Sequence, residues 1–169
     1  MKIKTAAAAV LLAALTLTPL SAAAYDSAAP GVERTMSGGA AESFAVDGNG
    51  TLWAWGDNLW GQLGDGGTED HTRPVKVLEN VRSVSAGEGH TYAVLEDNTL
   101  WAWGRNVSNA FPGMDDLVNS PTPIKIMDDV ASVSTGVVTH LAVKTDGTLW
   151  AWGKYIGNKT NKQVSTPQQ

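Results

Sequence analysis

The sequence predicts an all-β fold built from repeated, antiparallel four-stranded sheets. The hexapeptide Thr-Leu-Trp-Ala-Trp-Gly occurs three times without change, at residues 51–56, 99–104 and 148–153. The copies start 48 and 49 residues apart, and they contain six of the seven tryptophans. Each copy alternates its side chains with the period of two that is typical of a strand, and no stretch of the sequence has convincing helical periodicity.

Both faces of the hexapeptide strand are apolar. In the first copy Trp53 and Trp55 point to one side, while Leu52 and Ala54 point to the other. A strand with two apolar faces needs a neighbouring layer on each side. The small alanine leaves room for a large side chain, so we expect sheets stacked face to face with large-against-small packing.

The second repeat shows the strands most completely. It predicts strands at 74–77, 81–85, 90–95 and 99–103, with turns at 86–89 and 96–98. The first repeat aligns with strands at 43–46 and 51–55, and the third with strands at 124–127, 131–134, 139–144 and 148–152. Four short strands in a period of about 49 residues are the pattern of a β-propeller blade. We therefore group the four strands of one repeat, in chain order, as one blade.

The N-terminal residues are typical of a signal peptide. Lys2 and Lys4 precede the apolar run Ala6–Leu17, and Ala22–Ala24 offers a small-residue cleavage site. The apolar run is too short to span a membrane. We expect a signal peptide at 1–24, a flexible leader at 25–32, and a mature protein that is secreted, periplasmic or held at the cell surface.

The composition argues against several classes of function. The chain has no cysteine, and its net charge of −5 becomes more negative if Lys2 and Lys4 are removed with the signal peptide. A nucleic-acid partner requires a basic face, so none is expected. The residues Asp47–Thr51 resemble a calcium loop but lack its closing glutamate, and we interpret them as a hairpin turn. We expect no catalytic residues, no metal, no cofactor and no enzyme activity.

Long loops follow the Trp-Gly pairs, at 56–71 and 104–119. Loops of this length in a compact fold are often functional. Trp60 either packs against the next blade or anchors a partner protein, and these two interpretations carry equal weight, whereas the charged residues favour simple solvation. The candidate binding residues in these loops are Asp57, Asn58, Trp60, Glu69, His71, Arg105, Asn106 and Phe111.

Two segments resemble the repeat of the RCC1 (regulator of chromosome condensation) family. They are residues 55–64, Trp-Gly-Asp-Asn-Leu-Trp-Gly-Gln-Leu-Gly, and residues 86–94, Ala-Gly-Glu-Gly-His-Thr-Tyr-Ala-Val. WD-type and kelch repeats fit less well, because the strands end in Trp-Gly and no Gly-Gly pair recurs. The resemblance covers about residues 34–157 and implies structural roles for Trp53, Trp55, Gly56, Gly61, Gly64, Gly87, His90, Trp101, Trp103, Gly104, Trp150, Trp152 and Gly153. Glu42 and Thr139 stand where the family has its histidine.

The resemblance implies a seven-bladed β-propeller of antiparallel four-stranded sheets, but the chain is too short for seven blades. Seven units of about 49 residues require roughly 340 residues. We expect three RCC1-like repeats at 33–157 (about 33–56, 57–104 and 105–153). Residues 158–169 are then a polar tail or the start of a truncated fourth repeat. The three repeats form an open arc, which is either part of a longer propeller or completed by self-association.

We expect a secreted, non-catalytic propeller that binds a protein or a cell-surface ligand through its loops. The resemblance also implies an alternative, an enzyme inhibitor similar to the secreted propellers that inhibit β-lactamase. A structural fragment of a larger surface propeller is a further alternative. Guanine-nucleotide exchange on a Ran-type GTPase, the activity of the protein that gives the family its name, is disfavoured by the expected export. An enzyme is disfavoured by the lack of catalytic residues. No membrane span is expected after signal cleavage.

Overall fold

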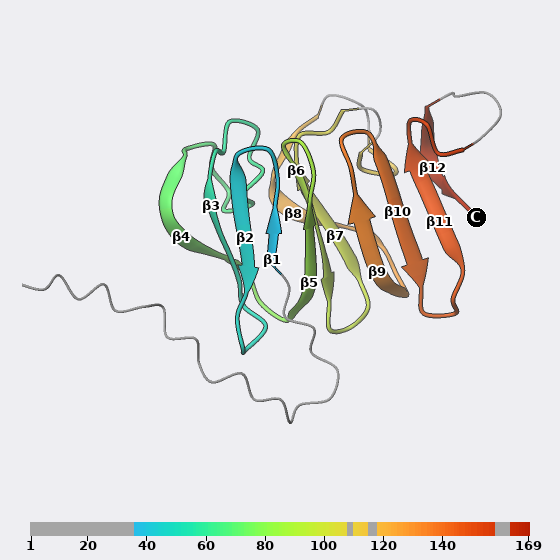
Figure 1. The fold of residues 1–169 in the computed structure, drawn as a ribbon, viewed down its shortest axis with the longest axis horizontal. Helices are drawn as coiled ribbons and strands as arrows, with labels where there is room; N and C mark the ends of the chain where they lie inside the picture. Colours follow the sequence, from blue (N-terminus) through green and yellow to red (C-terminus); the bar gives the residue numbers. More distant parts are fainter. Residues whose placement is uncertain (1–35, 108–109, 115–117, 158–162) are drawn as a thin grey trace, which may run out of the picture.

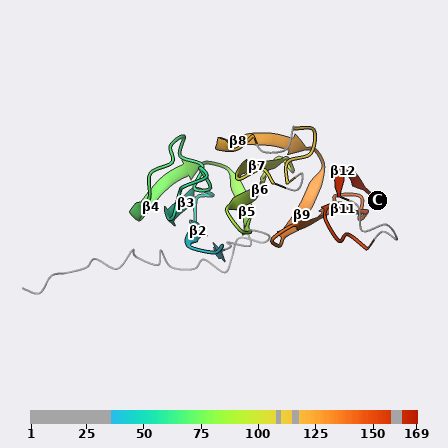
Figure 2. The same cartoon turned by 90° about the horizontal axis from the view of Figure 1, so that it is seen from above.

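The computed structural model describes residues 36–107, 110–114, 118–157 and 163–169, and in these parts the chain forms twelve β-strands and no helix. The predicted signal peptide and leader lie outside the described residues. The strands form three antiparallel four-stranded sheets, which stand one after another along the molecule in Figures 1 and 2. The all-β prediction of about three propeller-type blades in an open arrangement is therefore confirmed.

We number the sheets as blades 1 to 3. Blade 1 contains β1 (Met36–Gly38), β2 (Glu42–Val46), β3 (Leu52–Gly56) and β4 (His71–Leu78). Blade 2 contains β5 (Val81–Ala86), β6 (His90–Leu95), β7 (Leu100–Gly104) and β8 (Ser120–Met127). Blade 3 contains β9 (Val130–Thr135), β10 (Thr139–Lys144), β11 (Leu149–Gly153) and β12 (Val164–Gln168).

The predicted strands are present, but their grouping in chain order is wrong. Strand β4, predicted to open the second blade, instead pairs with β3 and closes blade 1, and β8 closes blade 2 in the same way. Only Glu79 and Asn80 separate β4 from β5, and Asn80 takes a left-handed conformation with φ 57°. This connection leads directly into the next sheet, whereas the long loop after β3 lets β4 return alongside it. Strand β12, which the sequence left as a tail or a fourth repeat, pairs with β11 in blade 3.

The threonine and the first tryptophan of the hexapeptide secure the turn that precedes them. Thr99 donates its backbone N–H to Asp97 over 3.0 Å, and its hydroxyl accepts the Trp101 indole N–H over 2.8 Å. Thr148 and Trp150 repeat this arrangement in blade 3. In blade 1 the Trp53 indole donates directly to Asp47. The segment that resembles a calcium loop is therefore the predicted hairpin turn.

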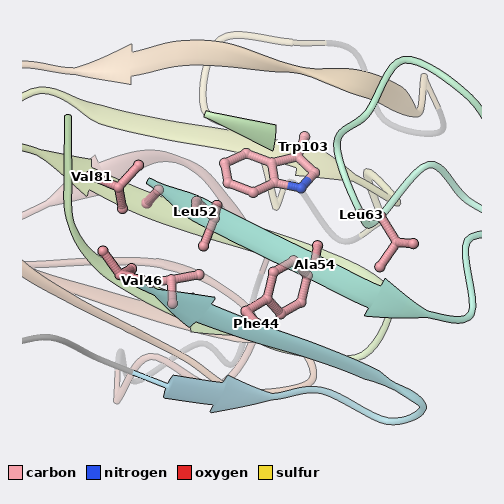
Figure 3. Close-up of a cluster of buried hydrophobic side chains, with 9 residues drawn as sticks. Phe44, Val46, Leu52, Ala54, Leu63, Val81 and Trp103 are labelled. Atoms are coloured by element: carbon pink, nitrogen blue, oxygen red, sulfur yellow. The ribbon is translucent and has the colours of Figure 1, made fainter. Parts of the chain in front are cut away.

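The second tryptophan of the hexapeptide joins neighbouring blades. The Trp103 indole is fully buried and lies against Leu52, Ala54 and Leu63 of blade 1 (Figure 3), and it donates to the Gln62 carbonyl over 2.8 Å. Trp152 is also fully buried and donates to the Ala110 carbonyl of blade 2 over 3.1 Å. A large indole therefore packs against the small alanine of the preceding blade, as the alternation predicts.

The last position of the hexapeptide requires glycine, because its backbone is left-handed and a neighbouring backbone lies close to it. Gly56, Gly104 and Gly153 have φ values of 113°, 92° and 95°, which side chains rarely tolerate. A Cβ at Gly104 would lie 2.5 Å from the Gly89 carbonyl oxygen, and one at Gly153 would lie 2.2 Å from the Val138 carbonyl oxygen. The chain can leave the sheet into the following loop only because this position has no side chain.

Candidate functional site: the loop end of the blades

The candidate binding residues gather at one end of the sheets, which we call the loop end. It consists of the described parts of 39–41, 57–70, 87–89, 105–119, 136–138 and 154–157. Antiparallel pairing places the turns of the inner hairpins and the long loops at this same end, seen at the top of Figure 1. Hydrogen bonds tie the two kinds of segment together, since Arg105 N–H donates to the Gly89 carbonyl and Lys154 N–H to the Val138 carbonyl, both over 2.7 Å.

Asn58 and Asn106 are buried in the base of the long loops. The Asn58 side chain accepts the Leu63 N–H over 3.0 Å and donates to Asp65 over 3.1 Å. Asn106 accepts the Phe111 N–H over 3.0 Å in the second loop. Both asparagines are inaccessible to solvent, so their side chains shape the loops and are not exposed to a partner.

Phe111 is buried as well, at the position that Leu63 takes in the first loop. Leu63 packs in the core between blades 1 and 2, and Phe111 packs in the core between blades 2 and 3. The Phe111 ring contacts Tyr92 edge to face, with the ring centroids 6.3 Å apart. Two loops with dissimilar sequences therefore insert an equivalent apolar side chain between their blades. The two loops share one sequence signal, since Leu63 and Phe111 each follow a buried asparagine by five residues.

Trp60 is half-buried at the boundary between blades 1 and 2. Its ring lies against Arg105, with the guanidinium carbon 4.8 Å from the ring centroid, and close to Gly89. Its backbone N–H donates to the Gln62 side chain, which in turn donates to Asp57. The structure places Trp60 and Arg105 together, so one face of the indole packs on the next blade.

Charged candidates in the first loop are partly engaged in pairs. The His71 ring lies 2.6 Å from the Asp65 carboxylate. Burial alone would raise the pKa of Asp65, but hydrogen bonds from Gly67, His71 and Asn58 lower it below its ordinary value. Glu69 is exposed, and the structure does not bring it to the Trp60–Arg105 contact through any hydrogen bond or ion pair among the described residues.

Four exposed apolar side chains at the loop end were missed by the sequence reasoning. Leu59, Val118, Val137 and Tyr155 are each more than half exposed. They come from loops of all three blades. Three of them follow a Trp-Gly pair, but nothing in their local sequence separates them from the buried Leu63. Only the position of the loops shows that they face solvent.

A concavity of about 330 Å³ lies at the loop end, between the inner turns of the three blades. Gly38–Ala40, Ala86–Glu88 and Thr135–Val137 line it. Its wall is mostly backbone and small side chains, with the exposed Glu88 and Val137 at its margin. Such a surface can accept an inserted side chain or loop, and it offers no assembled catalytic groups among the residues that line it.

Two histidines are buried beneath the inner turns, between blades 2 and 3. The Thr135 hydroxyl lies 2.9 Å from His90 Nε2 and 2.7 Å from His140 Nδ1. Burial lowers the pKa of His90 to about 4 and that of His140 to about 3, so both are neutral at pH 7. The His140 ring also packs on Tyr92 and Trp152. These rings act as core side chains between blades.

Glu42 takes the place of His90 in blade 1, as the sequence comparison of the repeats indicates. Glu42 lies opposite Gly56 just as His90 lies opposite Gly104. The Glu42 side chain is buried and accepts the Ala41 N–H over 3.0 Å. Burial raises the pKa of Glu42, and the nearby Asp57 adds to this effect.

No group of three or more histidine, cysteine, aspartate or glutamate residues with metal-binding geometry occurs among the described residues. Within the same part of the chain, no helix is long and apolar enough to cross a membrane.

Comparison with known proteins relates these blades to one repeat family. Residues 49–94 match the regulator of chromosome condensation (RCC1) repeat, and residues 81–109 match a second model of this repeat. No curated protein sequence matches the chain.

Solved structures that share the fold of the chain include the following three. Human WBSCR16 has a TM-score of 0.72 and 20% identity, over 79% of this chain and 36% of that one. Yeast RCC1 (Prp20) bound to Kap60 has a TM-score of 0.67 and 24% identity, over 79% and 36%. Prp20p from Saccharomyces cerevisiae has a TM-score of 0.69 and 25% identity, over 79% and 37%.

The match covers little more than a third of the length of these three proteins. The family matches fall on blades 1 and 2, and the structural matches extend over most of the described residues. Residues 49–109 match RCC1 repeats, and the three sheets are blades of an RCC1-like β-propeller.

Proposed function

We propose that this protein is a non-catalytic binding module that holds a partner protein at its loop end. The observation that carries this proposal is that Leu59, Val118, Val137 and Tyr155 are exposed on loops of the one end that also has the concavity. Binding residues are found disproportionately often on loops that a rigid scaffold holds in place.

The similar proteins support a protein partner. One of the yeast RCC1 structures contains Kap60, and the Prp20p structure was described together with binding to Gsp1p and histones. These partners are not assigned to this chain, because its match covers only about a third of the length of those proteins. The Trp60–Arg105 contact adds a half-exposed aromatic ring and a cation, which are common anchors in protein interfaces.

A pull-down with quantified bound proteins tests the proposal. The protein and two variants are used as baits, one with Leu59→Ser and Val137→Ser at the loop end and one with Glu96→Ser at the opposite end. We expect a partner that binds the protein and the Glu96→Ser variant equally, and that binds the loop-end variant at least tenfold more weakly. A partner held equally by all three baits would contradict a binding site at the loop end.

Export and enzyme inhibition are finer parts of this proposal. The charged start, apolar run and small residues of 1–24 support export. Sequencing the N-terminus of protein recovered outside the cytosol tests export, and the expected first residue is Tyr25.

Purified β-lactamases provide defined probes for the inhibitor alternative. Unchanged hydrolysis at micromolar protein would remove β-lactamase inhibition from the proposal.

A further inference from the structure

Each blade has two different faces, and they meet in the same order at both boundaries inside the chain. The Leu face carries the leucine and alanine of the hexapeptide, and the Trp face carries its two tryptophans. Between blades 1 and 2, Leu52 and Ala54 pack with Ala93 and Trp103. Between blades 2 and 3, the Leu face of blade 2 packs in the same way with the Trp face of blade 3. The Leu face of one blade is therefore complementary to the Trp face of the next.

The Leu face of blade 3 is not covered. Leu149 is 56% exposed, whereas Leu52 and Leu100 at the same position are fully buried. Leu141 is 39% exposed, although the same position in blades 1 and 2 holds a fully buried aromatic ring. Ala151 is likewise half-buried. The residues have the character of core positions but lack a neighbour among the described residues.

The Trp face of blade 1 is open in the complementary way. Trp55 is half-buried, whereas Trp103 and Trp152 at the same position are fully buried. Trp103 and Trp152 each donate the indole N–H to a loop carbonyl of the preceding blade. The Trp55 indole makes no such hydrogen bond within the described residues. Ala45, at the centre of the same face, is also half-buried.

A hydrogen bond between inner strands repeats at the two internal boundaries. Ser37 accepts the Ala86 backbone N–H over 2.9 Å, and Ser85 accepts the Thr135 backbone N–H over 3.1 Å. Ser134 is the next residue of this series and lies exposed on blade 3. Gly38 of blade 1 has the position that Ala86 has in blade 2. Acceptor and donor positions therefore exist at the two ends of the described row of blades.

We propose that a second copy of this chain covers both open faces in a head-to-tail arrangement. The Leu face of blade 3 in each copy packs on the Trp face of blade 1 in the other copy. These two equivalent contacts close a ring of six blades. Six lies within the usual range of four to eight for propellers, and head-to-tail contacts close into rings when the rotation allows it. A second copy is favoured over another partner because the chain already forms this same contact twice, between its own blades.

Solution mass measured by size exclusion with light scattering tests this arrangement on the full chain. We expect a discrete species of twice the 17.7 kDa chain mass. Leu149→Glu places a charge on the open Leu face, and Trp55→Ala removes the indole from the open Trp face. Each variant alone is expected to have the mass of a single chain, since each damages both boundaries of the ring. An equal mixture of the two variants is expected to form a dimer again, through the one boundary that stays intact.

Controls separate the contact from the fold and from the loop-end site. Leu59→Glu introduces the same change at an exposed leucine of the loop end and should keep the dimer mass. Circular dichroism should show unchanged β-structure in all variants. A single-chain mass of the unaltered protein at 100 µM, about the range of weak association, would overturn the proposal. A dimer broken by only one of the two variants would overturn the head-to-tail arrangement, because it would indicate pairing of like faces.

Discussion

The buried histidines show that equivalent positions in different blades can hold different side chains. His90 lies at a position where blade 1 has Glu42, and His140 comes from the neighbouring position on blade 3. The resemblance implied a structural role for His90, but the sequence could not place it beside His140. The two residues are 50 positions apart and meet only because blades 2 and 3 stack, with ring centroids 5.0 Å apart.

Stability is expected to fall as the pH is lowered from about 6.5 towards 4. The pKa values of His90 and His140 are lowered by burial, so the unfolded chain takes up protons in this range that the folded chain does not. The free energy of unfolding should decrease by about 2 kcal/mol for each histidine by pH 5, and it should be unaffected by them above about pH 7. Arg105 lies near enough to His90 to favour its neutral form further.

Urea unfolding at pH 7.5 and pH 5 measures this effect. The variant with His90→Gln and His140→Gln is the control, because its side chains take up no proton in this range. It should be less stable than the unaltered protein at pH 7.5 but lose less stability at pH 5. An equal loss in both proteins would show that the pH dependence does not arise from His90 and His140.

Asn58 is expected to be essential for the first long loop. Asn58→Ala removes the acceptor of the Leu63 N–H, which is buried, and the donor to Asp65. An unsatisfied buried N–H costs about 1–3 kcal/mol, and thermal unfolding should show a loss of this size. Asn49→Ala, at an exposed asparagine in a turn, is the matched control and should change stability by less than about 0.5 kcal/mol. Equal stability of the two variants would contradict a structural role for Asn58.

At the scale of the elements, the two tryptophans of one hexapeptide form different contacts, one within a blade and one between blades. Trp101 bonds within its own hairpin, whereas Trp103 bonds to the Gln62 carbonyl of the preceding blade. Alternation in the sequence predicts that both indoles share a face, and the pairing of Thr91 with Trp103 and of Ala93 with Trp101 agrees with that. Which neighbour each indole touches is decided by the stacking of the sheets.

Substitution of each tryptophan by phenylalanine should show how much its hydrogen bond contributes to the stability of the protein. Trp103→Phe removes the indole donor to the Gln62 carbonyl, which still accepts the Thr91 hydroxyl, and it leaves a cavity between the blades. The lost hydrogen bond and the cavity together are expected to cost about 1–3 kcal/mol. Trp101→Phe removes a hydrogen bond to Thr99 at a half-buried site and is expected to cost about 1 kcal/mol or less. Urea unfolding followed by circular dichroism compares them. A larger loss for Trp101→Phe would show that the boundary between blades 1 and 2 does not depend on this bond.

At the scale of the molecule, the open blade faces connect stability to association. A protein that is stabilised by binding a second copy melts at a temperature that depends on its concentration. The unaltered protein is therefore expected to melt a few °C higher at 100 µM than at 1 µM. Leu149→Glu should melt at the same temperature at both concentrations. A melting temperature of the unaltered protein that is independent of concentration would argue against the head-to-tail dimer.

The period, the strands and the turns of this protein can be predicted from its sequence alone. These features depend on residues close together in the chain, such as the Thr-Leu-Trp segment and the aspartate before it, so they can be recognised wherever the segment recurs. The family resemblance followed from the same local repeats, and it gave the propeller architecture.

The stacking of the blades determines which blade each outer strand joins and which loop residues are exposed. Asn58, Asn106 and Phe111 were candidates for binding, yet they are buried because their loops fold back between blades. Leu59 and Leu63 lie four residues apart in one loop, but one is exposed and the other is core. Burial depends on contacts between segments that are about 50 residues apart, and no local pattern of one repeat contains that information.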